Sequence, residues 1–166
     1  MSDITLRGNR IQTNGNLPGK GTPALDFKLV RTNMSDASLS DYKGLNIILN
    51  IFPSIDTSTC ATSVRKFNQM AASLPNTKVI CVSRDLPFAQ KRFCGAEGIE
   101  NVENLSDFKD GSFGKDYGLE MLDGSMAGLH ARAIVVVDKN GMITHTELVH
   151  DLADEPDYDS ALAVIK

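Results

Sequence analysis

Residues 45–60 read LNIILNIFPSIDTSTC, and this stretch decides the fold. Its first half, Leu45–Phe52, is mostly apolar and rich in branched side chains, as expected of a strand covered on both faces. Pro53 ends the strand, and the polar residues after it can cap a helix whose first turn contains Cys60. The apolar residues that follow recur at helical spacing (Val64, Phe67, Ala71 and Leu74). The stretch therefore predicts a buried strand that leads directly into an amphipathic helix.

The next segment repeats this order of strand and helix. Lys78–Ser83 predicts a second strand, and Pro87 stands near the first position of a second helix. That helix ends by Gly95 or Gly98, which places Cys94 in its last turn. Because right-handed crossovers bring both helix N-termini to one edge of the sheet, we expect the functional site at that edge.

Weaker patterns predict the remaining elements. They are a hairpin over residues 4–13 that turns at Gly8-Asn9, a strand at Asp26–Leu29, a turn at Ser38–Tyr42, a short strand and a short helix within 99–120, strands at Ala133–Val137 and Met142–Leu148 joined by a turn at 138–141, and a helix at Tyr158–Ile165. This order predicts a thioredoxin-like α/β fold, with a mixed central sheet flanked by helices and an N-terminal β-hairpin. We expect residues 1–166 to form a single domain, with residues 1–17 as the hairpin extension.

Charge and hydropathy exclude several classes of protein. The chain has 17 basic and 21 acidic residues, a net charge of −4, and no run rich in Lys or Arg. This balance predicts that nucleic acid is not a partner. The N-terminus has no apolar signal segment, and no stretch approaches the roughly eighteen apolar residues of a spanning helix, so we expect no membrane association and a cytoplasmic location.

Three cysteines, Cys60, Cys81 and Cys94, are too few for the disulfide framework of a secreted protein. Their spacing does not suit zinc, and no histidine has a cysteine or a second histidine three or four residues away, so we expect no metal site and no cofactor. Two hypotheses remain: buried inert thiols, or a catalytic pair with a bystander. Cys81, inside an apolar strand, is expected to be structural.

Cys60 stands in a pattern suited to thiol chemistry. A thiol attacks peroxide only as thiolate, which the unpaired N–H groups and positive dipole end of a helix N-terminus favour. In Pro53-x-x-x-Thr57-x-x-Cys60, the proline can shield the pocket edge, and the threonine hydroxyl can hydrogen-bond both the thiolate and the peroxide oxygen. The alternatives are a small buried hydrophobe at Cys60 and a helix N-cap at Thr57.

This motif resembles the active-site signature of the peroxiredoxins. Residues 54–68 (SIDTSTCATSVRKFN), the N-terminal hairpin, residues 128–133 (GLHARA) and residues 155–162 (EPDYDSAL) are similar to the thiol peroxidase (Tpx) branch, of the atypical two-cysteine type. The resemblance covers nearly the whole chain. It implies a peroxidatic Cys60 supported by Thr57 and Pro53, a guanidinium at Arg132, and a resolving Cys94.

The resemblance also implies an activity. It is the reduction of hydrogen peroxide and organic hydroperoxides, such as alkyl or lipid hydroperoxides, to water and alcohols through a Cys60 sulfenic acid and an intramolecular Cys60–Cys94 disulfide. Thioredoxin would re-reduce the disulfide, and the protein would be a homodimer that serves antioxidant defence. Ser58, Thr59, His130 and His150 depart from the branch, and these departures bear on pocket shape and substrate preference.

The chemistry independently requires a cation and a second thiol. Charge develops on the leaving oxygen, and the guanidinium of Arg132 can stabilise it, unless this residue is a surface arginine at a strand end. Cys94 gains no help from the helix dipole, and a core or surface thiol is its alternative. As resolver it needs no low pKa, because the sulfenic acid of Cys60 is already electrophilic.

Two other functions fit parts of the sequence. A thiol hydrolase would pair Cys60 with a histidine base, although the strand order brings no histidine predictably to Cys60. A non-enzymatic thioredoxin-fold redox sensor would keep Cys60 oxidisable without rapid turnover. Peroxide consumption with a reducing system separates these functions from a peroxidase.

Overall fold

The computed structural model describes residues 1–165. The strands are β1 (Asp3–Leu6), β2 (Asn9–Gln12), β3 (Lys28–Arg31), β4 (Asp36–Ser38), β5 (Asn46–Ile51), β6 (Thr77–Ser83), β7 (Glu103–Ser106), β8 (Ala133–Val137) and β9 (Ile143–Leu148). The helices are α1 (Ser58–Ala71), α2 (Pro87–Glu97), α3 (Ser112–Asp116) and α4 (Tyr158–Ala163), with a 3-10 helix at Leu39–Tyr42. Every strand and helix predicted from the sequence has a counterpart here.

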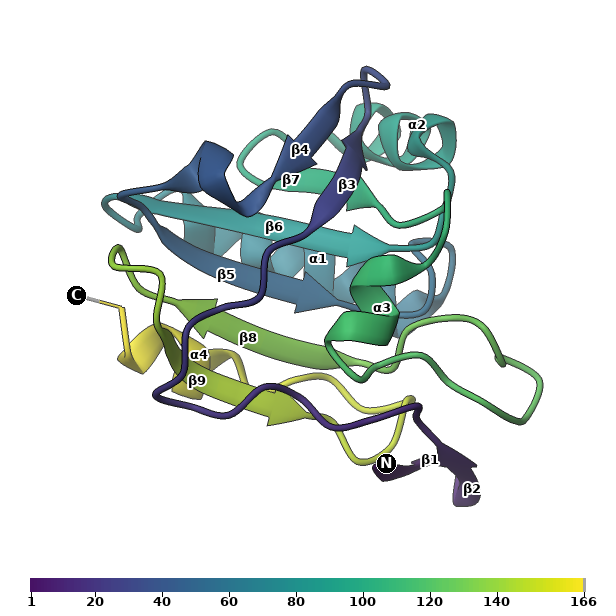
Figure 1. The fold of residues 1–166 in the computed structure, drawn as a ribbon. Helices are drawn as coiled ribbons and strands as arrows, with labels where there is room; N and C mark the ends of the chain where they lie inside the picture. Colours follow the sequence, from purple (N-terminus) through teal and green to yellow (C-terminus); the bar gives the residue numbers. More distant parts are fainter. Residues whose placement is uncertain (166) are drawn as a thin grey trace.

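The central sheet has the order β4-β3-β7-β6-β5-β8-β9, with β5 and β6 near its middle (Figure 1). β5 pairs with β6 in parallel, as β6 does with β7, whereas the other neighbours in the sheet are antiparallel. The predicted mixed, thioredoxin-like sheet is therefore confirmed. Because α1 follows β5 and α2 follows β6, both helices begin at the edge where these parallel strands end.

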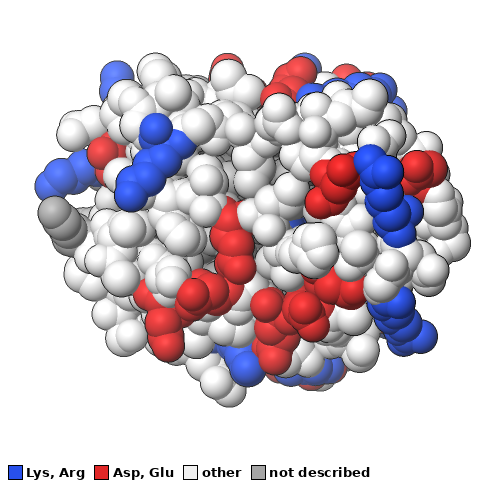
Figure 2. Space-filling model, turned by 90° about the horizontal axis from the view of Figure 1, so that it is seen from below, with Lys and Arg blue, Asp and Glu red and all other residues white. Residues whose placement is uncertain are grey.

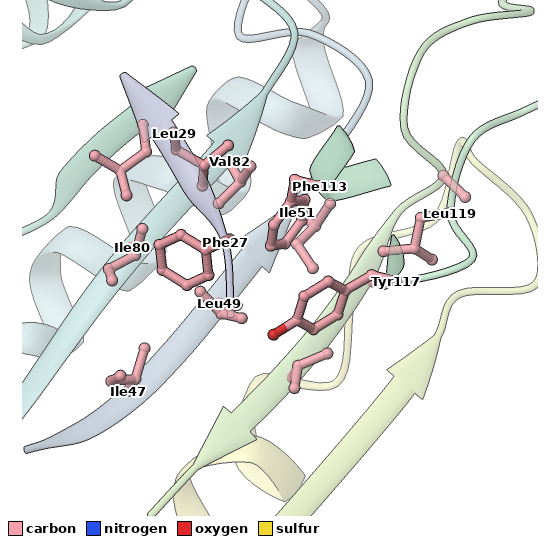
Figure 3. Close-up of a cluster of buried hydrophobic side chains, with 14 of the residues drawn as sticks. Phe27, Leu29, Ile47, Leu49, Ile51, Ile80, Val82, Phe113, Tyr117 and Leu119 are labelled. Atoms are coloured by element: carbon pink, nitrogen blue, oxygen red, sulfur yellow. The ribbon is translucent and has the colours of Figure 1, made fainter. Parts of the chain in front are cut away.

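Alternating side chains divide the core into two layers, one on each face of the sheet. The odd-numbered residues of β5 and β8 pack with α3 and the N-terminal segment, in the cluster that Figure 3 shows around Phe27, Phe113 and Tyr117. The even-numbered residues Ile134 and Val136 pack on the other face, in a cluster that includes Cys60. Cys60 therefore belongs to the layer of α1, α2 and α4.

Two turns differ from their predicted positions. The first hairpin turns at Arg7 and Gly8, not at Gly8-Asn9, because Leu6 pairs with Asn9 and leaves a two-residue loop with φ of 49° and 85°. The strand expected from Asp26 begins instead at Lys28. Asp26 lies outside it, and its carboxylate accepts the backbone N–H groups of Phe27 and Leu39.

Two further boundaries also moved. The segment predicted as a turn at Ser38–Tyr42 is a 3-10 helix at Leu39–Tyr42, and the unpredicted strand β4 precedes it, because β3 offers a partner for residues 36–38. The last helix ends at Ala163 instead of Ile165, and the N–H of Val164 already bonds the carbonyl of Leu162. Short elements whose partners are distant leave little local pattern.

The N-terminal segment passes very close to the chain just after α3, where Asn16 contacts Gly118. Gly118 has a φ of 71°, and a Cβ there would lie 2.5 Å from the backbone nitrogen of Asn16. Gly141 has a similar φ of 81°, but a Cβ there would meet nothing within 4 Å. The two glycines thus separate the effect of backbone conformation from that of close packing.

We expect Gly118→Ala to lower the free energy of unfolding by about 1–3 kcal/mol more than Gly141→Ala, because only Gly118 adds a steric conflict to the unfavourable φ. Urea denaturation of both variants measures the difference. Equal losses would show that the backbone of residue 16 moves away at no cost.

Candidate active site

The first turn of α1 holds Cys60, whose side chain is fully buried. Thr57 occupies the N-cap position with extended backbone angles, but its hydroxyl donates to the carbonyl of Ser54 at 3.0 Å instead of accepting a helix N–H. Thr57 is therefore the N-cap residue by its backbone position, but its side chain does not cap the helix. Pro53, at the end of the preceding strand, is also buried. The hydroxyl oxygen of Thr57 keeps the capacity to accept a further hydrogen bond.

Arg132 is only 2% exposed, so its alternative as a surface arginine is wrong. Its Nε and Nη2 donate to the carbonyl of Leu152 at 3.2 and 2.8 Å. Within residues 1–165, its buried Nη1 has no hydrogen-bond partner. Side chains alternate between the two faces of a sheet, and Ile134 and Val136, two and four residues after Arg132, pack in the cluster that contains Cys60. The Arg132 side chain therefore lies on the same face of the sheet as the Cys60 thiol.

One segment links this guanidinium to the helix that carries the thiol. Arg132 bonds the carbonyl of Leu152, and the hydroxyl of Thr59 donates to the next carbonyl, that of Ala153, at 3.2 Å. The N-terminal hairpin holds the same segment, because the Leu152 N–H donates to the Thr5 carbonyl at 2.8 Å. The Thr5 hydroxyl donates to Asp151 at 2.7 Å. The structure therefore brings Arg132 and the first turn of α1 together on one braced segment.

The loop before α1 is held by a carboxylate that the sequence analysis did not select as a site residue. Asp85 accepts hydrogen bonds from the Ser54 hydroxyl and the Ile55 N–H at 2.7 Å each, and from the Ser83 hydroxyl at 2.6 Å. Its position directly after a strand that ends at the same sheet edge is a sequence signal that could have found it.

Cys94 lies in the last turn of α2, as predicted, and is half-buried. Burial raises the pKa of its thiol, and its Sγ accepts a hydrogen bond from Asn104 Nδ2 at 2.9 Å. Its carbonyl accepts the N–H groups of Gly98 and Ile99, which close the helix end. The three cysteines are all free, so the structure corresponds to the dithiol form.

Cys81, the second cysteine in the sequence, lies in strand β6 and not in a helix. Its side chain is fully buried, and this burial raises its pKa to about 12. Asn50 Nδ2 approaches its sulfur at 3.6 Å and partly opposes that rise. A thiol with this pKa stays protonated, which fits the expected structural role.

The hydrogen bonds of the described residues do not connect any histidine to Cys60. Buried His130 pairs with Asp107 at 2.8 Å and contacts Phe113 on the α3 side of the sheet, whereas His150 is exposed. In the part of the chain that the structure describes, no histidine is hydrogen-bonded to Cys60, and no group of three or more His, Cys, Asp or Glu could hold a metal ion. The hydrolase hypothesis therefore gains no support from the structure.

Ser58 and Thr59, the two polar departures in the motif, line a shallow groove with Thr62 and residues 153–155 beside the first turn of α1. The larger hollow near Tyr42 and Val137 contains none of the reactive residues. The polar groove therefore lies beside the helix turn that carries Cys60.

The comparisons with known proteins agree with this arrangement. The Redoxin family model matches residues 19–162. The chain belongs to the redoxin family. Within it, this redoxin is 55% identical to a thiol peroxidase of Mycobacterium tuberculosis over 165 residues, which cover 99% of both chains. It is 50% identical, over the same shares, to a thiol peroxidase of Corynebacterium glutamicum. The predicted thiol peroxidase branch and the peroxidase class are thereby confirmed.

Solved structures share the fold of this redoxin. A peroxiredoxin-like protein from Aquifex aeolicus superimposes with a TM-score of 0.93 at 32% identity, covering 99% of this chain and 96% of its own. A thiol peroxidase from Chromobacterium violaceum gives a TM-score of 0.91 at 22% identity, covering 98% and 94%, and shows the fold alone. Among the described helices, none is long and apolar enough to cross a membrane.

The raised pKa of Cys81 predicts a pH dependence of stability. Between its ordinary value of 9.0 and about 12, the unfolded chain releases the Cys81 proton and the folded chain does not. The free energy of unfolding should therefore fall as pH rises above about 9, by up to about 1.4 kcal/mol per pH unit. Urea denaturation under reducing conditions should show a shallower decline for Cys81→Ala, and identical pH slopes would contradict this.

Proposed function

We propose that this redoxin reduces hydrogen peroxide and organic hydroperoxides with Cys60 as the peroxidatic residue. The observation that carries the proposal is Arg132, a buried guanidinium that has one unpartnered nitrogen and lies on the same sheet face as the buried thiol. A buried charge without its full set of hydrogen bonds destabilises the fold, so its presence calls for a functional explanation. The N–H groups of Nη1 have no hydrogen-bond partner among the described residues and can therefore donate to an oxyanion.

The first step transfers one oxygen atom. The thiolate of Cys60 attacks the terminal peroxide oxygen, an S–O bond forms, and the O–O bond breaks with its electron pair on the leaving oxygen. Protonation of that oxygen gives water or an alcohol, and Cys60 becomes a sulfenic acid. Arg132 stabilises the developing charge, and the Thr57 hydroxyl oxygen orients the peroxide proton. Pro53 shields the pocket from bulk water.

The second step uses Cys94. Its sulfur attacks the sulfenic sulfur of Cys60, the S–O bond breaks, and water leaves as the disulfide forms. A dithiol protein then re-reduces the disulfide, and family resemblance makes thioredoxin the proposed reductant. We propose Cys94 for this step because it is the half-buried thiol on the neighbouring helix, whereas Cys81 is fully buried.

The resemblance also supports a homodimer built from one domain, residues 1–166 with the extension 1–17, that serves antioxidant defence. Three cysteines are too few for the disulfide framework of a secreted protein, which supports the proposal of a cytoplasmic location. Figure 2 shows acidic side chains gathered near the middle of one face, with Lys and Arg toward its sides. Such a face supports the proposal that nucleic acid is not a partner.

Cysteine variants test the assignment of the thiols. Cys60→Ser should abolish peroxide consumption with a thioredoxin system, because no other thiol stands at a helix N-terminus. Cys81→Ser should keep nearly full activity, and Cys94→Ser should form sulfenic acid yet turn over slowly. Stopped-flow peroxide consumption measures all three. A non-enzymatic sensor would show oxidation of Cys60 without rapid turnover, and equal losses at Cys60 and Cys81 would refute the assignment.

Arg132→Lys tests the guanidinium. The point charge of an ammonium cannot satisfy Leu152 and donate to the peroxide in the same geometry, so the second-order rate constant for Cys60 oxidation should fall by about 10²-fold. Arg65→Lys, which changes an arginine paired with Glu97 on the exposed side of α1, is the matched control and should leave the rate unchanged. An undiminished rate in Arg132→Lys would remove Arg132 from the site.

A further inference from the structure

We propose that Asp85 is a positioning residue that holds the loop before Cys60 in its peroxide-reactive conformation and thereby limits the rate of disulfide formation. The proposal rests on the proposed function and adds a control point to it. The carboxylate of Asp85 bonds to Ser54, Ile55 and Ser83 and not to Cys60. It acts through the loop of Ser54 and Ile55, which leads into the first turn of α1.

The contacts of Asp85 span two separate elements. On one side its carboxylate accepts the Ser54 hydroxyl and the Ile55 N–H. On the other side it accepts the hydroxyl of Ser83, the last residue of β6. Hydrogen bonds to a carboxylate are about twice as strong as neutral ones, so this residue binds the loop firmly to the end of β6.

The side of Asp85 that faces the sheet is itself fixed. Fully buried Gln90 donates to the hydroxyl of Ser83 at 3.2 Å and to the carbonyl of Leu105 at 3.0 Å. The Ser106 hydroxyl donates to the backbone carbonyl of Asp85. These groups belong to the start of α2 and to β7, so they hold Ser83 and the backbone of Asp85 in place. The loop of Ser54 and Ile55 can therefore separate from the Asp85 carboxylate without moving Asp85.

Disulfide formation requires such a release. Cys60 is fully buried at the start of α1, whereas Cys94 lies near the end of α2, about 10 Å along the helix from Pro87 at 1.5 Å per residue. A disulfide tolerates Cα separations of only about 4.4–6.8 Å. One or both helix ends must therefore unwind, and the bonds of Asp85 to Ser54 and Ile55 hold the end that carries Cys60.

Asp85 should consequently act in opposite directions on the two steps. A held loop keeps Cys60 in place on the face of the sheet that carries Arg132, for attack on peroxide, but it delays the meeting of the Cys60 sulfenic acid with Cys94. During that delay a second hydroperoxide can oxidise the sulfenic acid to sulfinic acid, itself being reduced to water or alcohol. Asp85 would thus favour fast peroxide reduction at the expense of resistance to over-oxidation.

The chain offers a matched control in the same loop. Asp56 also joins the loop to α2, through an ion pair with Arg92 at 3.3 Å, but the side chains of this pair are 60% and 66% exposed. Exposed pairs contribute little. Asp56→Asn removes the same charge as Asp85→Asn from a neighbouring contact and leaves the part-buried hydrogen bonds of Asp85 intact.

The experiment follows both steps in reduced wild type, Asp85→Asn and Asp56→Asn by rapid-quench thiol labelling and mass spectrometry, because the chain has no tryptophan for a fluorescence readout. In Asp85→Asn, Cys60 oxidation should slow about tenfold, equivalent to about 1.4 kcal/mol, roughly one charge-assisted hydrogen bond. Disulfide formation should accelerate, and more peroxide should be needed to convert half of Cys60 to sulfinic acid. Asp56→Asn should match wild type in all three measurements.

A parallel decline of both rates in Asp85→Asn would indicate general loss of structure and overturn the proposal, as would unchanged rates or the same changes in Asp56→Asn. Ser54→Ala, which removes one of the three hydrogen bonds, should change both rates in the same directions by smaller factors. Hydrogen exchange of the reduced proteins provides a readout independent of catalysis: amides 54–62 should exchange faster in Asp85→Asn alone. If wild type consumes no peroxide, the proposed function fails, whereas unchanged exchange refutes the role of Asp85.

Discussion

The buried guanidinium of Arg132 is the interaction on which the rest of the site depends. Removing a positive charge from water is costly, and the carbonyl of Leu152 compensates for only part of that cost, because Nη1 keeps no partner among the described residues. The segment that provides this carbonyl is fixed by Thr59 of α1 and by Thr5 of the N-terminal hairpin. Three regions far apart in the chain therefore hold one cation in place, and the hairpin contributes to the site without touching it.

The three cysteines show how environment separates chemically identical groups. Cys60 lies at a helix N-terminus, on the face of the sheet that carries Arg132. Cys81 lies in the centre of β6, where burial keeps its thiol protonated. Cys94, at a helix C-terminus, is half-buried beside Asn104 and needs no activation if its target is a sulfenic acid. Position relative to helix ends and solvent, more than sequence context, separates the environments of the three thiols.

The site also combines two opposing requirements. Reaction with peroxide needs a preorganised loop, because charge stabilisation is effective only when donors are already aimed. The proposed Cys60–Cys94 disulfide would need the same region to unwind, because Cys60 lies at the start of α1 and Cys94 near the end of α2. The helix end at Cys94 is closed by the N–H groups of Gly98 and Ile99, and the loop before Cys60 is held by Asp85. In the proposed reaction cycle, the strengths of these two sets of hydrogen bonds set how readily the two helix ends unwind.

The sequence by itself determined the order of elements, the thioredoxin-like sheet and the placement of Cys60 and Cys94 on their helices, because hydrophobic periodicity and capping residues act locally. It also pointed to Arg132, but only through resemblance, since no local pattern distinguishes a buried arginine from an exposed one. The tertiary structure alone decided that Arg132 is buried with a free Nη1, that Asp85 holds the loop, and that the hairpin braces residue 152. These contacts join residues from about 20 to 150 positions apart, and such pairings are specified by packing, which a single sequence read locally does not reveal.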